Sequence, residues 1–333
     1  MHMQAVRIHA YGTPEVMQLE TLSIPTPGSG QALVRVEAAS VNFLDIQHRR
    51  GDLVKQAFYQ QKAGLKMTLP TIIGSQGIGT VESFGPDTAN PRVHTGSRVA
   101  FFGSSYATHA VVPAAHLIPV PDGISLEEAA AGLNQGFLAY AFTHHTYPVK
   151  QGDWCLVQAA AGGLGHLICQ IAKLRGGRVI GVTSSAEKAD MVKAMGADEV
   201  ILSQQADIAK EVQRITEGKG VHVVYDGVGK DTFEANLDSL TPGGYLVIYG
   251  QSSGYVPPFD LMRLQEKGSL FITRTNGLPY THEYPTYLQQ FATWLKEGKL
   301  SIRIDHTYAL ADAAKAHKAV EQRRSSGRIL LLP

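Results

Sequence analysis

Short apolar segments separated by turns dominate the first part of the chain, residues 1–128. The segments 32–38, 78–84 and 109–112 combine alternating apolar positions with flanking Gly- and Pro-rich turns. Such alternation is typical of strands that bury one face, and the turns between them favour antiparallel pairing. The pattern predicts a mostly antiparallel, barrel-like domain over these residues.

From about residue 129 the pattern changes to continuous apolar segments, each followed by a segment with helical spacing. Continuous apolar strands are typical of a parallel sheet that is covered on both faces. The expected strands are 154–158, 178–183, 199–202, 221–226, 245–250 and 269–274, with helices near 165–175, 186–195, 207–217, 231–240 and 259–267. This α/β alternation predicts a doubly wound parallel sheet. A helix over 312–322 and a strand over 327–332 then return to the style of the first domain.

The turn after the first of these strands is rich in small residues. It reads AAAGGLG over 159–165, a variant of the dinucleotide fingerprint in which Ala160 stands at the first glycine position. Small residues let the backbone approach a pyrophosphate, and the helix that follows directs free N–H groups at the anion. Glycines at such a turn also serve close packing, but the placement favours a nucleotide site. The residues predicted to contact the nucleotide in this turn are Ala161, Gly162, Gly163, Leu164 and Gly165.

The end of the second strand indicates which nucleotide is bound. A site for NAD normally has Asp or Glu there, to hold the ribose 2′-hydroxyl. This chain has Thr183, Ser184 and Ser185 instead, with Lys188 one turn into the next helix. Because hydroxyls and a cation suit a 2′-phosphate, these residues favour NADPH. The other interpretation is that a serine caps the helix and that Lys188 lies on its solvated face.

Two later strands end in small residues that are expected at the same edge of the sheet. Val228 follows one of them, and Gly250, Gln251 and Ser252 follow the other. Because ligands bind at the carboxyl ends of parallel strands, these residues are further candidates for cofactor contacts. Asp226 has two interpretations, a cap for the next helix or a contact with the ligand.

Length, charge and cysteine content limit the class of protein and its expected cellular setting. The chain has 333 residues with a formal net charge of +1, and 44% of them are hydrophobic, which fits a globular protein of two domains. The near-neutral charge gives no electrostatic footprint for a nucleic acid or an anionic membrane. No apolar run has the length of a membrane span. Two cysteines, Cys155 and Cys169, exclude a disulfide framework and predict a reducing, cytoplasmic setting.

Six short motifs stand in order along nearly the whole chain. They are YGTPEVM at 11–17, NFLD at 42–45, the turn 159–165, YDGVG at 225–229, QSSG at 251–254 and QEKGSL at 265–270. Together they resemble the medium-chain dehydrogenase/reductase superfamily, in particular its zinc-free quinone oxidoreductase (zeta-crystallin-like) branch. The resemblance implies a GroES-like, mostly-β catalytic domain over 1–128 and 276–333, and a Rossmann domain that binds NADPH over 129–275.

The resemblance also bears on zinc. Zinc-dependent relatives have a ligand Cys in the segment here occupied by 42–45, and Gly-His-Glu where this chain has Gly74-Ser75-Gln76. Amide and hydroxyl groups are poor substitutes for a thiolate and an imidazole on Zn²⁺. We therefore expect no metal, and a reaction that needs no Lewis acid.

Hydride transfer from NADPH to a conjugated acceptor fits such a site, because a quinone or enone spreads the incoming charge over its own π-system. The resemblance places Asn42 and Gln135 near the nicotinamide, and Asp45 is expected to fix the loop rather than to donate a proton. Many relatives have a Tyr two residues after that Asp. Here Gln47 takes its place, and Tyr59 is a candidate for replacing the lost phenol.

Three functions are compatible with these residues. The first is an NADPH-dependent quinone reductase, and the second is reduction of the C=C bond of an alkenal or enone. The third is a non-enzymatic role in binding NADPH or RNA, and the absence of a basic, aromatic stripe argues against RNA. By analogy with the family we also expect a homodimer formed through the edge strand 269–274.

Overall fold

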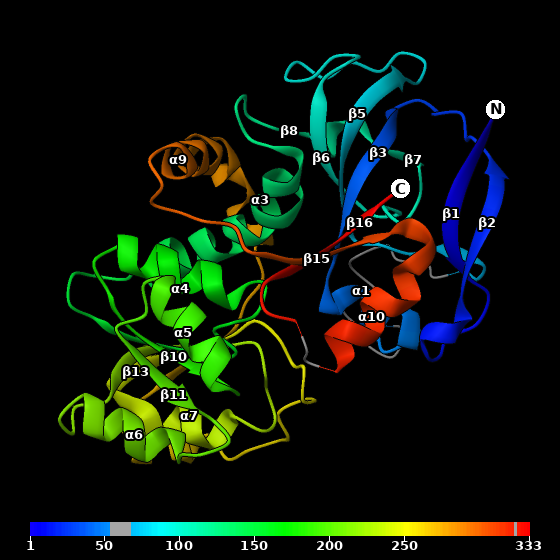
Figure 1. Ribbon diagram of the computed structural model, residues 1–333. Helices are drawn as coiled ribbons and strands as arrows, with labels where there is room; N and C mark the ends of the chain where they lie inside the picture. The colour runs from blue at the N-terminus through cyan, green and yellow to red at the C-terminus, as the bar shows by residue number, and fades with distance from the viewer. Residues whose placement is uncertain (54–67, 323–324) are drawn as a thin grey trace. The chain divides into compact units, whose positions relative to one another are not determined.

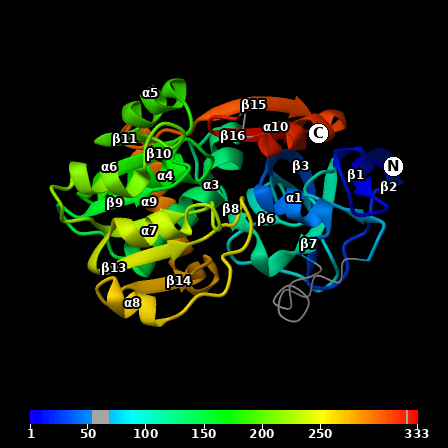
Figure 2. The same ribbon diagram turned by 90° about the horizontal axis from the view of Figure 1, so that it is seen from below.

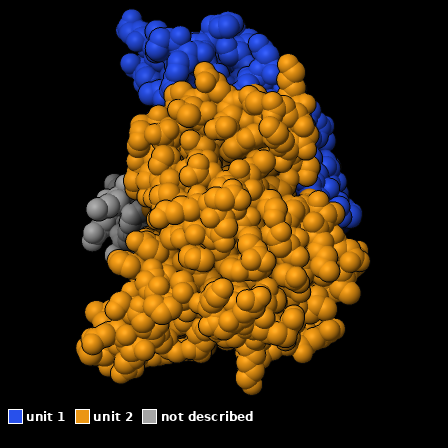
Figure 3. Space-filling model, turned by 90° about the vertical axis from the view of Figure 1, so that its left-hand side faces the viewer, with its two compact units in different colours: residues 1–133, 303–333 blue, residues 134–302 orange. Residues whose placement is uncertain are grey.

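The computed structural model describes residues 1–53, 68–322 and 325–333, which fall into two units (Figure 1). Unit 1 comprises Met1–Leu133 and Arg303–Pro333, and unit 2 comprises Asn134–Ile302 (Figure 3). Tyr59, a predicted substrate contact, lies outside the described residues. Within the described ranges, no helix is both long enough and apolar enough to cross a bilayer.

Unit 1 is built on a seven-stranded sheet of order β15-β16-β3-β5-β6-β8, with β7 paired to β3. Its strands are β3 (Gln31–Val41), β5 (Gln76–Phe84), β6 (Arg98–Phe102), β7 (His109–Pro113), β8 (Ile118–Pro119), β15 (Ile304–Ala309) and β16 (Arg328–Leu332). Of the described pairs in this sheet, only β15 and β16 run parallel. Apolar side chains of β3, β5, β6 and β7 meet in one core that includes Val34 and Phe101. The predicted, mostly antiparallel first domain is therefore confirmed.

A second, three-stranded sheet of order β2-β1-β4 and two helices complete the framework of unit 1. They are β1 (His2–Ile8), β2 (Met17–Ser23), β4 (Thr71–Ile72), α1 (Phe43–Arg50) and α10 (Ala313–Glu321). β16 pairs antiparallel with β3, and Ile329 lies opposite Val41. Because α1 begins just after Val41, this register brings Arg328, near the end of the chain, beside the start of α1.

Unit 2 contains a six-stranded sheet of order β11-β10-β9-β12-β13-β14, whose strands all pair in parallel (Figures 1 and 2). The strands are β9 (Trp154–Val157), β10 (Arg178–Thr183), β11 (Glu199–Leu202), β12 (Val221–Asp226), β13 (Leu240–Ile248) and β14 (Phe271–Arg274). The helices are α4 (Gly165–Leu174), α5 (Ala186–Ala194), α6 (Ile208–Ile215), α7 (Phe233–Ser239), α8 (Met262–Glu266) and α9 (Tyr284–Lys296). Helix α3 (Leu126–Ala141) leads the chain from unit 1 into unit 2.

The order of these strands is that of a doubly wound sheet, which confirms the prediction. Right-handed crossovers place α4 and α5 on one face and α6 and α7 on the other, because the direction of winding reverses at β9 and β12. Leu156, Ile180, Val224 and Leu246 are fully buried, as expected for strands covered on both faces. β13 begins at Leu240, earlier than predicted, since it pairs with the start of β12 before a shift in register.

Residues 276–302 fall in unit 2, whereas the predicted boundary assigned them to the first domain. Helix α9 packs on the part of α3 that lies in unit 2. Tyr284 stacks on Phe137 with ring centroids 3.8 Å apart, and Tyr287 meets the same ring edge-on. Gly136 permits this approach, because a Cβ there would lie 2.2 Å from the Tyr287 hydroxyl. The first crossing of the chain likewise lies at 133/134 rather than at 128/129.

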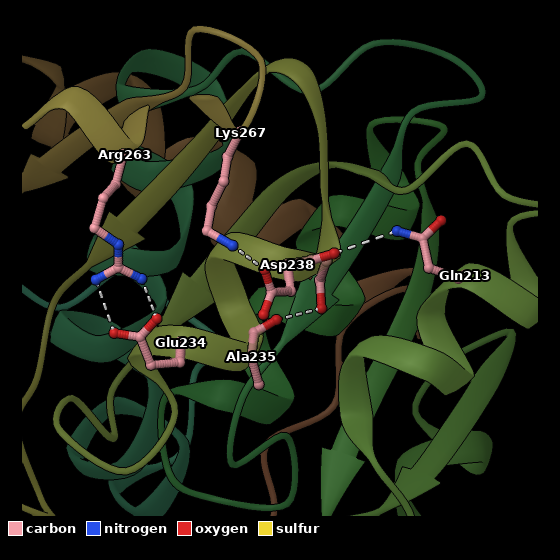
Figure 4. A network of polar contacts seen from close by, with 7 residues as sticks. Gln213, Glu234, Ala235, Asp238, Arg263 and Lys267 are labelled. Carbon is pink, nitrogen blue, oxygen red and sulfur yellow. Dashed lines mark hydrogen bonds and ion pairs between the residues drawn. The ribbon is translucent and has the colours of Figure 1, made fainter. Parts of the chain in front are cut away.

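Ion pairs join α7 and α8 on the surface of unit 2 (Figure 4). Arg263 of α8 contacts both carboxylate oxygens of Glu234, and Lys267 pairs with Asp238. Gln213 of α6 donates to the main-chain oxygen of Asp238 at 3.2 Å. Since α8 precedes β14, this network holds the segment that leads into the edge strand.

Candidate functional site

The glycine-rich turn lies where the order of the parallel strands reverses. It connects the end of β9 at Val157 to the start of α4 at Gly165, and β9 stands between β10 and β12. In α/β sheets this switch point is where ligands bind. The His166 N–H donates to the Gly162 carbonyl at 3.2 Å and the Leu167 N–H to the Leu164 carbonyl at 3.1 Å, so these two groups close the turn onto the helix. The positive end of the α4 dipole still favours an anion at this turn.

Backbone contacts inside the turn allow only glycine at position 165. A Cβ on Gly165 would lie 2.4 Å from the Ala159 carbonyl oxygen. The Gly162 N–H donates to that same oxygen at 2.8 Å and closes the turn. Ala159 itself adopts a left-handed φ of 50°, so the residue that takes the glycine-like conformation is Ala159 and not Ala160. The resulting cradle of small residues fits a pyrophosphate.

At the end of β10, one of the two serines caps the helix that follows. Ser185 is the N-cap of α5, and its Oγ accepts a hydrogen bond from the Lys188 N–H at 3.4 Å. Thr183 is buried, and its carbonyl accepts from the N–H of Ser203 at 2.8 Å and from the Ser203 hydroxyl at 3.2 Å. Ser184 is exposed beside them. The Ser184 hydroxyl and the Lys188 ammonium remain the predicted ligands of a phosphate.

Asp226 is fully buried at the end of β12, and its carboxylate is engaged by its own loop. The oxygens accept from the Val228 N–H at 2.7 Å, the Gly229 N–H at 3.1 Å and the Thr232 hydroxyl at 3.0 Å. Burial raises the pKa of this carboxyl, and the hydrogen bonds oppose that rise. Thr232 is the N-cap residue of α7, so Asp226 acts on the loop before the helix instead of capping it.

The loops that follow β12 and β13 are held together through their main chains. The Gly227 carbonyl accepts from the Ser252 N–H at 3.1 Å, and a Cβ on Gly250 would lie 2.5 Å from the same oxygen. The side-chain oxygen of Gln251 accepts from Arg274 at 2.7 Å. The predicted residues of these loops therefore lie together at the carboxyl edge of the sheet, where the glycine-rich turn also lies.

In unit 1, Asn42 and Asp45 form a reciprocal cap at the start of α1. The Asn42 N–H donates to Asp45 Oδ2 at 2.8 Å, and the Asp45 N–H donates to the Asn42 carbonyl at 3.0 Å. The second carboxylate oxygen accepts from the Ser75 N–H at 2.7 Å, which joins the helix to the loop before β5. Burial raises the pKa of Asp45 to about 6, although hydrogen bonds from Ser75 and Asn42 oppose the rise.

Two further side chains, which the sequence did not suggest, extend this cap into a buried network. The Tyr106 hydroxyl lies 3.2 Å from Asp45 Oδ2 and 3.0 Å from His317 Nε2. Both rings are fully buried. Burial, together with the nearby Arg49, lowers the pKa of His317 to about 3, so the imidazole is neutral at physiological pH.

The side chain of Asn42 has polar partners on both of its ends. Its Oδ1 accepts from Arg328 Nη2 at 2.9 Å, and its Nδ2 lies 3.1 Å from Ser75 Oγ and 3.4 Å from Gln76 Oε1. Of these partners, Ser75 and Gln76 stand where the resemblance implies the histidine and glutamate of zinc-dependent relatives. Across residues 1–53, 68–322 and 325–333, no three His, Cys, Asp or Glu side chains could hold a metal ion together.

The remaining predicted residues lie elsewhere in the two units. Gln47 stands on α1, half-buried, one turn before the left-handed Gly51 that ends the helix. Gln135 lies on α3 in unit 2, where it is 8% exposed. Asn42, Asp45 and Gln47 thus belong to unit 1, and the other described candidates belong to unit 2.

Two family profiles match the chain. "Alcohol dehydrogenase GroES-like domain" matches residues 28–122, which lie in unit 1, and "Zinc-binding dehydrogenase" matches residues 163–293, which lie in unit 2. The matches agree with the GroES-like and Rossmann architecture expected from the motifs.

Characterised relatives align with the chain from end to end. It is 37% identical to the quinone oxidoreductase of Pseudomonas aeruginosa over 98% of this chain and 99% of the relative. It is 36% identical to the 2-haloacrylate reductase of a Burkholderia species, over 100% of this chain and 99% of that one. Among solved structures, Escherichia coli quinone oxidoreductase complexed with NADPH superimposes on this chain with a TM-score of 0.91. The two sequences are 32% identical, and the match covers 99% of this chain and 100% of that one.

Proposed function

The chain belongs to the quinone oxidoreductase branch of the medium-chain dehydrogenase/reductase superfamily, and from this membership we propose that it reduces a quinone with NADPH. The observation that carries the proposal is the glycine cradle at the switch point of unit 2, followed by a strand end without a carboxylate. In the reaction, NADPH, a quinone and one proton give NADP⁺ and the hydroquinone. The bound nicotinamide supplies the hydride, and the protein's task is to orient the two reactants and to exclude water.

The test of this function is direct. The purified protein should oxidise NADPH when 1,4-benzoquinone or 9,10-phenanthrenequinone is added, with one hydroquinone formed per NADPH consumed. Absence of turnover with every quinone tried would contradict the proposal.

We propose that the preference for NADPH rests on Ser184 and Lys188. A lysine ammonium and an exposed hydroxyl pair with a phosphate dianion and gain nothing from a ribose hydroxyl. Lys188→Ala should raise the KM for NADPH about 10-fold and change that for NADH much less. Lys193→Ala, in the last turn of the same helix, is the matched control. Equal effects of Lys188→Ala on the two cofactors would rule out the phosphate contact.

We propose that the reaction needs no zinc. In the segments that the resemblance aligns with the metal ligands of zinc-dependent relatives, the Asn42 amide contacts Ser75 Oγ and Gln76 Oε1 instead. Activity should survive dialysis against a strong chelator, and metal analysis of the active protein should give less than one zinc per ten chains, on the order of background. Loss of activity that zinc restores would be the opposite result.

Reduction of a conjugated C=C bond is the second candidate, and the 2-haloacrylate reductase relative favours it. The same hydride geometry serves a quinone and an enone, because both delocalise the charge that arrives. Steady-state rates with benzoquinone, 2-chloroacrylate and an alkenal, each at saturating NADPH, separate the two candidates. A kcat/KM for an alkene that exceeds every quinone value would make C=C reduction the main activity.

We also propose a homodimer in which β14 pairs with its counterpart. β14 is an edge strand of the unit 2 sheet, and Phe271 on it is 52% exposed while it stacks on Tyr245. Sedimentation should show a dimer, and Phe271→Asp should give monomers. Leu19→Asp, on the edge strand β2 of unit 1, replaces a similarly exposed side chain and should leave the dimer intact.

The cellular setting that we propose is the reducing cytoplasm. Cys155 and Cys169 are buried free thiols. Burial raises the pKa of both, to about 12 for Cys169, so neither thiol is suited to disulfide exchange.

A further inference from the structure

The register of β16 on β3 places a buried cation beside Asn42, the residue of unit 1 that the resemblance places near the nicotinamide. Ile329 pairs with Val41, so the next positions, Arg328 and Asn42, meet across the two strands. Arg328 is 5% exposed, and its main-chain N–H is anchored to the Arg303 carbonyl at 2.8 Å. Two residues that are 286 positions apart in the sequence are thus held in contact by the sheet itself.

The chemistry of a guanidinium decides which way the Asn42 amide points. Arg has donors and no acceptor, so the amide atom that faces Arg328 Nη2 at 2.9 Å must be the oxygen. The NH₂ group is therefore turned to the opposite side, toward Ser75 Oγ at 3.1 Å and Gln76 Oε1 at 3.4 Å. A neutral partner in place of Arg328 would let the amide turn over.

The donor on Asn42 is suited to a ligand oxygen. The contact with Gln76 is long for a hydrogen bond, so this N–H can exchange it for a hydrogen bond to a better acceptor at little cost. Asn42 is only half-buried, whereas Arg328 and Gln76 are buried. In a quinone or enone, hydride addition to carbon moves the π electrons onto the carbonyl oxygen, which then takes a proton from water. A donor fixed toward that oxygen stabilises the charge that develops.

We infer that Arg328 is a positioning residue, which fixes Asn42 as a hydrogen-bond donor to the carbonyl oxygen of a conjugated substrate. This inference rests on the proposed reductase function. Arg328 acts through Asn42 and does not itself meet the substrate.

Three single variants and one double variant, Arg328→Met with Asn42→Asp, test this role through the quinone reaction. Arg328→Met should lower kcat with benzoquinone about 100-fold, the lower end of the cost of losing one oxyanion donor, while the Kd for NADPH stays within about 2-fold. Arg328→Lys keeps a donor-only group and should recover most of the rate. Asn42→Asp keeps an oxygen toward Arg328 but loses the NH₂ donor, and it should be at least as slow as Arg328→Met. The double variant should be no slower than Asn42→Asp, because both changes remove the same interaction.

A binding measurement separates this inference from the proposed function. 4-Nitrophenolate carries a delocalised oxyanion and absorbs in the visible, so its Kd can be measured without turnover. Arg328→Met and Asn42→Asp should each weaken its binding about 10-fold, and Arg328→Lys should not. If the wild type reduces no quinone or enone, the proposed function fails. The binding of nitrophenolate to the variants still tests whether Arg328 fixes the Asn42 NH₂ group as a donor. Additive losses in the double variant, or no rescue by lysine in either measurement, would overturn the positioning role.

Discussion

Unit 1 and unit 2 place their polar groups in different ways. In unit 1, Asp45, Arg49, His317 and Arg328 lie inside the fold, each at most 5% exposed, and Tyr106 links two of them. In unit 2 the ion pairs of α7 and α8 lie on the surface (Figure 4), and the predicted phosphate site is formed chiefly by backbone. The geometry of the first site thus depends on a network of buried polar side chains, and that of the phosphate cradle on chain conformation. The buried Asp226 holds the loop after β12, which is a separate part of the unit 2 site. This difference predicts which substitutions each unit tolerates.

The largest expected effect is a single methyl group in the backbone-built cradle. Gly165→Ala places a Cβ 2.4 Å from the Ala159 carbonyl, which cannot move away as a side chain could. We expect a loss of about 2 kcal/mol in stability and a fall of about 30-fold in NADPH affinity. Calorimetric titration with NADPH measures the affinity, and urea unfolding measures the stability. Gly162→Ala, where the same distance is 3.1 Å, is the matched control and should do much less. Equal effects of the two variants would show that packing at Gly165 does not control the cradle.

The buried ion pair of unit 1 should show the next largest effect. Arg49 is fully buried, and its guanidinium pairs with Glu321 at 2.5 Å. Glu321 also pairs with Arg50 at 2.7 Å. Glu321→Gln leaves a buried guanidinium without a counter-charge but keeps an acceptor oxygen, so it should cost about 1.5 kcal/mol in the free energy of unfolding. Urea denaturation of the wild type and of the variant measures this difference in the free energy of unfolding.

Glu15→Gln is the control for that measurement, because Glu15 pairs with Lys318 on the same helix, α10, but in solvent. It should leave the urea midpoint nearly unchanged. A midpoint for Glu321→Gln that also stays unchanged would mean that burial of Arg49 does not depend on its partner.

The dependence of stability on pH is the third way to examine the network. The pKa of Asp45 is raised from 3.8 to about 6, so the folded protein binds the extra proton between these values, and this contribution falls as pH rises. The pKa of His317 is lowered from 6.5 to about 3, so the unfolded chain binds the extra proton, and this contribution rises with pH. Between about pH 4 and pH 6 the two oppose each other, each by at most about 1.4 kcal/mol per pH unit.

Variants separate these opposing contributions. The free energy of unfolding of the wild type minus that of His317→Gln should rise with pH across this window, and the same difference for Asp45→Asn should fall. Urea unfolding at several pH values gives both slopes, and contributions from all other groups cancel in the differences. Two slopes of the same sign would contradict the assignment of one neutral histidine and one protonated carboxyl.

The same contrast explains what could be predicted from the sequence. The cradle of unit 2 is local, since residues 159–165 and 183–188 each lie within one strand-turn-helix segment. The alternation of apolar segments predicted the doubly wound parallel class of its sheet. Only the left-handed Ala159 and the loop-bound Asp226 needed coordinates, because the sequence pattern carries no φ angle and no hydrogen-bond partner.

The network of unit 1 could not be predicted in this way. Tyr106 and His317 lie 61 and 211 positions from their hydrogen-bond partners, and Arg328 lies 286 positions from Asn42. No periodicity links such residues, and they meet only because β16 returns to pair with β3. The boundary at 275/276 differed for a similar reason, since the aromatic face of α9 finds its partner on α3.

The smallest expected effect is on the surface network of unit 2, and it tests whether burial is what distinguishes the two units. Arg263→Met removes both contacts with Glu234, whose side chain is 62% exposed (Figure 4). Water solvates the carboxylate that is left, so the urea midpoint should stay within error of the wild type. Lys267→Met should behave alike, because Asp238 is 49% exposed. A shift in either variant as large as that of Glu321→Gln would mean that the number of contacts, and not the burial of the charge, sets the strength of these networks.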